Sequence, residues 1–129
     1  MPIVRIEDSV PRSAETKQNI IEVVYCCLKS IFRVNDEELQ ARYQTYDKEN
    51  FHAPGGKLEY LQVEITIFKG RTFETKHKLY QALSGELAKL LNISPEAILI
   101  ILNEHKAENW GMRGGIPASE IDFGYSITI

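Results

Sequence analysis

Apolar and polar residues alternate in two short stretches of the chain, and a helical pattern follows each stretch. Residues 2–8 (PIVRIED) and 60–68 (YLQVEITIF) alternate, which predicts strands with one buried face. In the segments that follow, apolar residues recur every three or four positions, which predicts two amphipathic helices. Ser13 and Thr72 stand where helix N-caps are expected, and each is followed two residues later by a glutamate that suits a first helical turn.

A second strand is predicted after each helix, at residues 41–46 and 97–102. The latter lies in AILIIL, which is apolar at every position, a pattern typical of a strand buried on both faces. Residues 111–115 (GMRGG) are expected to form a flexible turn, and renewed alternation over residues 121–129 predicts a closing strand.

The order of these elements repeats because the sequence itself repeats. PRSAETK at residues 11–17 aligns with GRTFETK at residues 70–76, so that Arg12 meets Arg71. The same shift of 59, without a gap, continues to match residues over about fifty positions, which chance similarity rarely does. We therefore predict one domain, residues 1–129, built from two copies at residues 2–51 and 61–110.

Two βαβ units predict an α+β fold, with a four-stranded mixed sheet and both helices on one face. The second face is then left bare, and the chain offers no third helix to cover it. The all-apolar strand at residues 97–102 nevertheless requires cover on both sides. Self-association of the chain is the simplest way to provide it.

Composition narrows the functional classes. The net charge of −3 gives no indication of a nucleic-acid or anionic-membrane surface. No apolar run reaches the roughly 18–20 residues of a membrane span, and the first residues lack a signal peptide's apolar core, so we expect a cytoplasmic protein. Cys26 and Cys27 are neighbours and are expected to stay reduced, while the three histidines match no metal-ligand spacing. We expect neither a metal nor a cofactor.

Pro2 becomes chemically interesting because methionine before proline is normally removed, which would leave a free secondary amine at the head of a strand. The opening MPIVRIEDSVPRSAETK resembles the start of 4-oxalocrotonate tautomerase-like proteins. The doubled length, KGRTFETK and NISPEAILIILNEHKAENWGMRGG are similar to the fused branch of the tautomerase superfamily, which includes malonate semialdehyde decarboxylase.

The resemblance implies a β-α-β fold, a homotrimer packed through its sheets, and a pocket around the amino-terminal proline. Residue by residue, it implies that Pro2 and Arg71 are catalytic. It also implies that Lys69 helps Arg71 to bind the carboxylate of a small substrate, and that Trp110 and Met112 form an apolar wall.

The sequence departs from the family pattern at two positions. Lys69 replaces an arginine and so loses bidentate carboxylate binding. Ala41 stands where the decarboxylase carries an acidic residue that works with water, which weakens the case for decarboxylation or hydration. Proline-based tautomerisation needs no such acid.

The residue types suit a keto–enol shift in a 2-oxo acid, which needs a base with a pKa near 7. An N-terminal amine titrates at about 7.7–8.0, and nearby cations and an apolar wall would lower that pKa. Leu61 takes the place of Pro2 in the second copy, so one working site per chain is expected. The alternatives are a decarboxylase, hydratase or dehalogenase of the same superfamily, or a catalytically silent trimeric binding protein.

The arginines leave further alternatives open. Arg12 could simply pair with Glu15 on the surface, and Arg71 could likewise pair with Glu74. Arg113, in the glycine-rich turn, could either reach the pocket or remain exposed.

Overall fold

The structure is a computed structural model that describes residues 2–129. Two long helices and four long strands form its frame: β1 (Ile3–Asp8), α1 (Ala14–Cys27), β2 (Gln40–Thr45), β3 (Leu61–Phe68), α2 (Phe73–Leu91) and β4 (Ile98–His105). A small hairpin consists of β5 (Gly111–Met112) and β6 (Ile116–Pro117). A π-helical turn spans Leu28–Phe32, and short 3₁₀ turns span Asp36–Glu38, Lys48–Asn50, Pro54–Gly56, Pro95–Ala97, Ala107–Asn109 and Ala118–Glu120.

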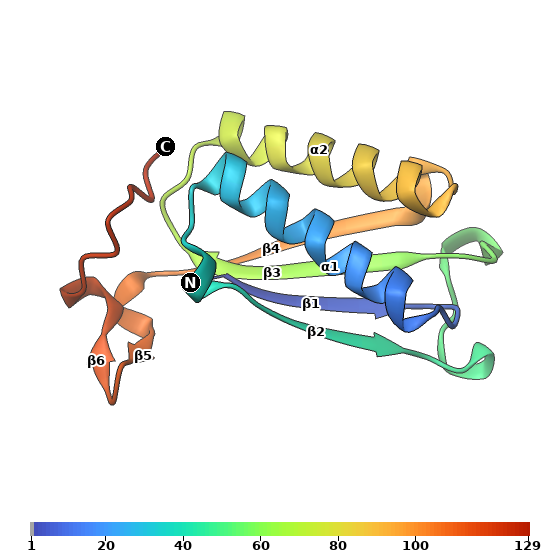
Figure 1. Cartoon of the computed structure of the whole chain (residues 1–129), viewed down its shortest axis with the longest axis horizontal. Helices are drawn as coiled ribbons and strands as arrows, with labels where there is room; N and C mark the ends of the chain where they lie inside the picture. Colours follow the sequence, from blue (N-terminus) through green and yellow to red (C-terminus); the bar gives the residue numbers. More distant parts are fainter. Residues whose placement is uncertain (1) are drawn as a thin grey trace.

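The main sheet has the order β2-β1-β3-β4, and α1 and α2 lie side by side on one of its faces (Figure 1). The pairs β1–β2 and β3–β4 are parallel, while β1 and β3 are antiparallel, so the predicted mixed sheet of two βαβ units is confirmed. Ile3 pairs with Gln40, and Gln62 pairs with Leu99, 37 residues further on in both units. An ungapped duplication would give this shared register.

The core lies between the sheet and the two helices. Alternate strand residues, among them Val4, Ile6, Val63 and Ile65, are fully buried against the helices. The sequence predicts that β4 is buried on both faces. Its residues on the helix side do pack on the core, whereas Leu99 on the other side is 39% exposed. A single chain therefore leaves one face of the sheet uncovered.

Both helices begin where the sequence predicts. The Ser13 hydroxyl accepts a hydrogen bond from the Thr16 amide, and the Thr72 hydroxyl accepts one from the Thr75 amide. Each cap satisfies one of the free N–H groups of the first turn. Helix α2 ends at Asn92, whose left-handed conformation is a common way to stop a helix.

The structure corrects two expectations about the C-terminal region. Only residues 113–115 form the expected turn, because Gly111 and Met112 form β5 of a hairpin in which Met112 pairs with Ile116. In the described chain, residues 121–129 form no strand, although burial still alternates along them. The segment lies beyond the end of the main sheet, near the start of α2, and it pairs with none of the strands of that sheet (Figure 1).

Over residues 2–129, no helix combines the length and the apolar character needed to cross a membrane.

Candidate active site

The strand register determines what surrounds Pro2. Ile3 pairs with Gln40 at the start of β2 and with Thr66 near the end of β3. Continued by one residue, this register places Pro2 between Leu39, just before β2, and Ile67, within β3, and Pro2 is buried. Glu38 precedes Leu39 in the chain, and Lys69 and Arg71 follow the end of β3.

A cleft of about 480 Å³ opens beside Ile3, and three segments meet in it. The approach to β2, the β5 hairpin and the C-terminal segment together contribute Glu37, Glu38, Gln40, Trp110, Gly111, Met112, Arg113 and Phe123. The two residues predicted to form an apolar wall, Trp110 and Met112, are therefore both in this cleft. Arg113 also lines it, with its guanidinium carbon 5.6 Å from the centre of the Phe123 ring.

Trp110 is held by other aromatic rings. Its ring meets that of Phe68 edge to face, with centroids 5.0 Å apart, and Phe68 in turn packs against Phe123 at 5.4 Å. The indole Nε1 is buried and has no hydrogen-bond partner in residues 2–129. Trp110 thus provides apolar surface and also a donor that lacks an acceptor, and leaving such a donor unpaired costs about 1–3 kcal/mol.

Arg71 is buried, with 6% of its surface exposed. Its guanidinium carbon lies 4.5 Å from the centre of the Phe32 ring, and Nη1 donates a hydrogen bond to the Phe68 carbonyl at 3.3 Å. No ion pair within the described chain involves Arg71, so the alternative of a pair with Glu74 is wrong, and the buried Nε donor has no partner. Burial lowers the pKa of Arg71, and Tyr125 and the charges of Glu104 and Glu38 oppose this effect.

A buried carboxylate connects Arg71 to the cleft. Glu38 is 6% exposed, and its Oε2 accepts a hydrogen bond from the Tyr125 hydroxyl at 2.7 Å. Its Oε1 accepts one from Asn35 Nδ2 at 2.9 Å, and the same amide group donates to the Phe123 carbonyl. Burial raises the pKa of Tyr125, and the hydrogen bond to Glu38 raises it further.

Reasoning from the sequence missed Glu38, Asn35, Tyr125 and Phe123. Glu38 stands in an acidic run, NDEE, where every carboxylate looks equally solvated. Tyr125 fitted an expected strand and carried no separate signal. The apolar alternation at the C-terminus was a usable sign that this segment packs on the molecule.

The structure separates the predicted cations from the cleft. Lys69 is exposed and does not line the cleft, and its backbone N–H donates to the His105 carbonyl at 2.8 Å. Arg71 does not line the cleft directly either, but Tyr125 and Glu38 connect it to the cleft wall. Ala41 packs against the core on the helix side of β2.

Arg12, the counterpart of Arg71, has a different environment. Its Nε donates to Asp8 Oδ2 at 2.7 Å, and its Nη2 lies 3.3 Å from a Glu59 oxygen. The alternative of a surface pair with Glu15 is therefore wrong, because the fully buried Asp8 is the nearer carboxylate. Burial alone would lower the pKa of Arg12, but the hydrogen bond and charge of Asp8 outweigh this and raise it.

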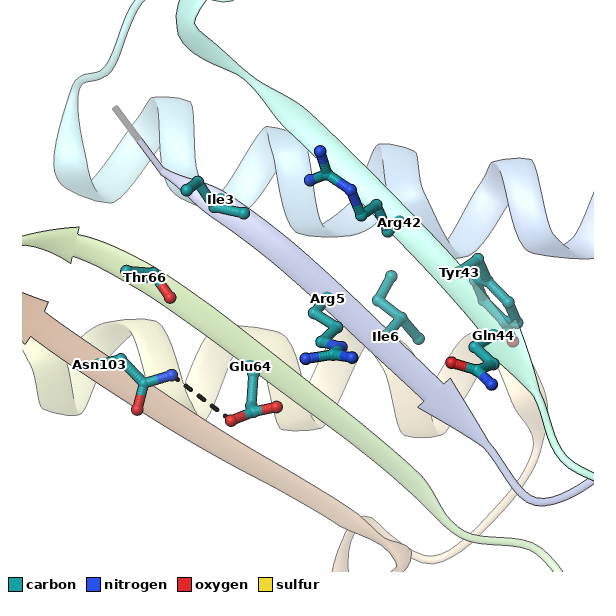
Figure 2. A pocket seen from close by; sticks show the side chains of 9 residues that line it. All are labelled: Ile3, Arg5, Ile6, Arg42, Tyr43, Gln44, Glu64, Thr66 and Asn103. Carbon is teal, nitrogen blue, oxygen red and sulfur yellow. Dashed lines mark hydrogen bonds between the residues drawn. The ribbon is translucent and has the colours of Figure 1, made fainter. Parts of the chain in front are cut away.

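A second hollow, of about 560 Å³, lies on the uncovered face of the sheet (Figure 2). Arg5, Arg42 and Glu64 project into it from three neighbouring strands, and Asn103 donates a hydrogen bond to Glu64 at 3.4 Å. Ile3 lines both this hollow and the cleft, so the two are neighbours. The hollow is the larger of the two, but its arginines are exposed, so we place the candidate active site in the cleft.

Metal-binding clusters are absent from the part of the chain that the structure describes, where no group of three or more His, Cys, Asp or Glu side chains converges. Cys26 is exposed and Cys27 is buried, and both are free thiols. Burial raises the pKa of Cys27 to about 11, which makes it a poor nucleophile at neutral pH.

Residues 41–113 match the sequence model of the tautomerase enzyme family, and the chain belongs to the tautomerase superfamily. Solved structures with the same fold include Pt0534 inactivated by 2-oxo-3-pentynoate, which shares 21% identity at a TM-score of 0.84 and covers 93% of this chain and 99% of that one. Another is the W0 fused 4-OT symmetric trimer, with 16% identity, a TM-score of 0.84, and 92% and 99% of the two chains covered. FG41 malonate semialdehyde decarboxylase inhibited by 3-bromopropiolate is also similar, with 21% identity, a TM-score of 0.71, and 89% and 92% covered.

Proposed function

We propose that this protein is a tautomerase that interconverts the keto and enol forms of a small 2-oxo acid, with Pro2 as the general base. The observation that carries the proposal is the environment of Arg71. This cation is buried, lacks an ion-pair partner in the described chain, and keeps an Nε–H without an acceptor. A substrate carboxylate would supply both the countercharge and the acceptor.

Pro2 performs the proton transfer once Met1 has been removed; Met1 lies outside the described residues. The secondary amine takes the enol hydroxyl proton, and the resulting ammonium returns a proton to the neighbouring carbon to give the keto form. Pro2 is buried, and both burial and the positive charges that follow β3 would disfavour the ammonium form, so the pKa of the amine is expected to fall toward neutrality. A base with a pKa near the working pH is the most effective one.

The other residues hold the acid in place. Arg71 binds the substrate carboxylate, and Lys69 adds a second positive charge at the outer end of β3. Trp110 and Met112 cover the carbon skeleton and exclude water, which strengthens the charged contacts inside the site. The unpaired indole N–H of Trp110 provides one further donor to an oxygen-rich ligand.

Decarboxylation or hydration of a 3-oxo acid is a second candidate, and one observation favours it. Ala41 does not supply the missing acid, but Glu38 places a carboxylate in the cleft wall three residues earlier. The proposal ranks below tautomerisation because Glu38 already accepts two hydrogen bonds that hold it in place.

We also propose that the chain assembles as a homotrimer through the uncovered face of the sheet. Leu99 is partly exposed on this face, and helices cover only the other one. Among the proteins with the same fold, the W0 fused 4-OT is a symmetric trimer. Sedimentation equilibrium at micromolar concentration checks this, and a clean monomer would contradict it.

Two preparations test the catalytic assignment: one that retains Met1 and one from which it has been removed, each verified by intact mass. We expect ketonisation of an enol acid only in the processed form, rising with pH through an apparent pKa below the ordinary amine value of about 7.7–8.0. The Met1-bearing form has an acylated Pro2 nitrogen that is not basic. Equal activity in both preparations would remove Pro2 from the mechanism.

A further inference from the structure

We propose that Tyr125 and Glu38 are positioning residues for Arg71, so that the C-terminal segment completes the carboxylate-binding part of the site. This inference rests on the proposed function and adds two residues to it. Neither side chain needs to touch the substrate in order to act. Their role is to fix the direction in which the arginine presents its free donor.

The first argument is the geometry around the arginine. One face of the Arg71 guanidinium packs on the Phe32 ring, and Nη1 is fixed by the Phe68 carbonyl. Tyr125 lies beside the same guanidinium, and its hydroxyl donates to Glu38. Three elements that are distant in sequence therefore hold one side chain, which lowers the entropy lost when a ligand binds.

The second argument is the arrangement of the charged groups around Arg71. A carboxylate paired directly with Arg71 would occupy the donors that a substrate needs, as Asp8 does for Arg12. Here the phenol of Tyr125 stands between the arginine and the Glu38 carboxylate. Glu38 thus compensates part of the buried positive charge without taking the place of the substrate.

The third argument is the fixed position of the C-terminal segment. Asn35 donates to the Phe123 carbonyl at 2.9 Å, and the Thr72 amide donates to the Ile129 carbonyl at 3.1 Å. Gly70 leaves room for this approach, because a Cβ there would lie 2.9 Å from the Ile127 carbonyl oxygen. Tyr125 therefore belongs to a segment that is hydrogen-bonded to the rest of the fold both before and after it in sequence.

A double-mutant cycle on ligand binding tests the inference. Pyruvate is the probe, its dissociation constant is measured by calorimetry, and the variants are Tyr125→Phe, Arg71→Ala and the double variant. We expect Tyr125→Phe to weaken binding about five- to twentyfold, and to have little further effect when Arg71 is already absent. Tyr43→Phe is the matched control, because it removes a phenol that likewise donates to a buried carboxylate, that of Asp8, but lies away from Arg71. It should leave pyruvate binding unchanged.

Glu38→Gln keeps the shape of the side chain, and it is the second variant should Tyr125→Phe fail to fold. It should weaken pyruvate binding and raise KM with a smaller change in kcat. Additive effects of Tyr125→Phe and Arg71→Ala would overturn the inference, and so would the absence of pyruvate binding by the native chain. Pyruvate binding without ketonisation by the Met1-free protein would contradict only the proposed function.

Discussion

The two arginines that the duplication makes equivalent, Arg12 and Arg71, differ in how the fold compensates their positive charge. Arg12 is bound to the fully buried Asp8 and lies close to Glu59, so its charge is neutralised within the fold. Arg71 is more deeply buried than Arg12, packs on an aromatic ring and has no ion pair in the described chain. The pKa is raised for Arg12 and lowered for Arg71. Within the described chain, the arginine of the first copy is paired with carboxylates and the arginine of the second copy is not.

The largest expected difference between the two regions is in folding stability. Arg12→Ala should lower the free energy of unfolding by about 3–5 kcal/mol, because it leaves the buried Asp8 carboxylate without its cation. Arg71→Ala should lower the free energy of unfolding by less, because no carboxylate is paired directly with Arg71 and left without its cation. Urea unfolding at one fixed chain concentration measures both. Restoration of stability in the Asp8→Ala, Arg12→Ala double variant would show that the stranded charge is the cause, and an equal cost for both arginines would contradict the comparison.

In catalysis, by contrast, Arg71→Ala should have the larger effect of the two variants. Arg71→Ala should reduce kcat/KM on a carboxylate substrate by about 2–4 kcal/mol, the size expected when one partner of a buried charged contact is lost. Arg12→Ala should change kcat/KM far less per folded molecule, because Leu61 stands where that copy would need an amine. Steady-state kinetics on the Met1-free protein decides between them. Equal losses would overturn the assignment of one site per chain.

The smallest expected effect concerns the two phenols that contact the buried carboxylates. Burial raises the pKa of Tyr43 and of Tyr125 above 10.0, and hydrogen bonds to Asp8 and Glu38 raise them further. A raised folded pKa means that the stability they contribute is present below about pH 10 and is lost as pH increases through the folded values. Absorbance titration at alkaline pH should show these two phenols ionising last among the tyrosines. Tyr43→Phe and Tyr125→Phe should each remove one of them, and titration of both near pH 10 would contradict the prediction.

Much of the fold follows from the sequence because its signals are local. Residue alternation indicated β1 and β3, hydroxyl caps at Ser13 and Thr72 placed the helix starts, and the shift of 59 showed two units. These features depend on hydrogen bonds and side-chain directions within a few residues. Placement of the C-terminal segment failed for the same reason. Its alternation correctly indicated one packed side, but a strand also needs a partner strand from elsewhere in the fold, and within the described chain this segment pairs with none.

The candidate site shows where local reasoning ends. The sequence determined that an arginine precedes each helix, and the resemblance to a known family directed attention to Pro2, Trp110 and Met112. Only the tertiary structure decided that Arg12 meets Asp8 rather than Glu15, since both carboxylates are near it in sequence. The contact between Tyr125 and Glu38 joins residues 87 positions apart, and the burial of the Glu38 carboxylate strengthens it. Charges in a low-dielectric interior are governed by whichever partner the fold brings close, and no spacing along the chain encodes that partner.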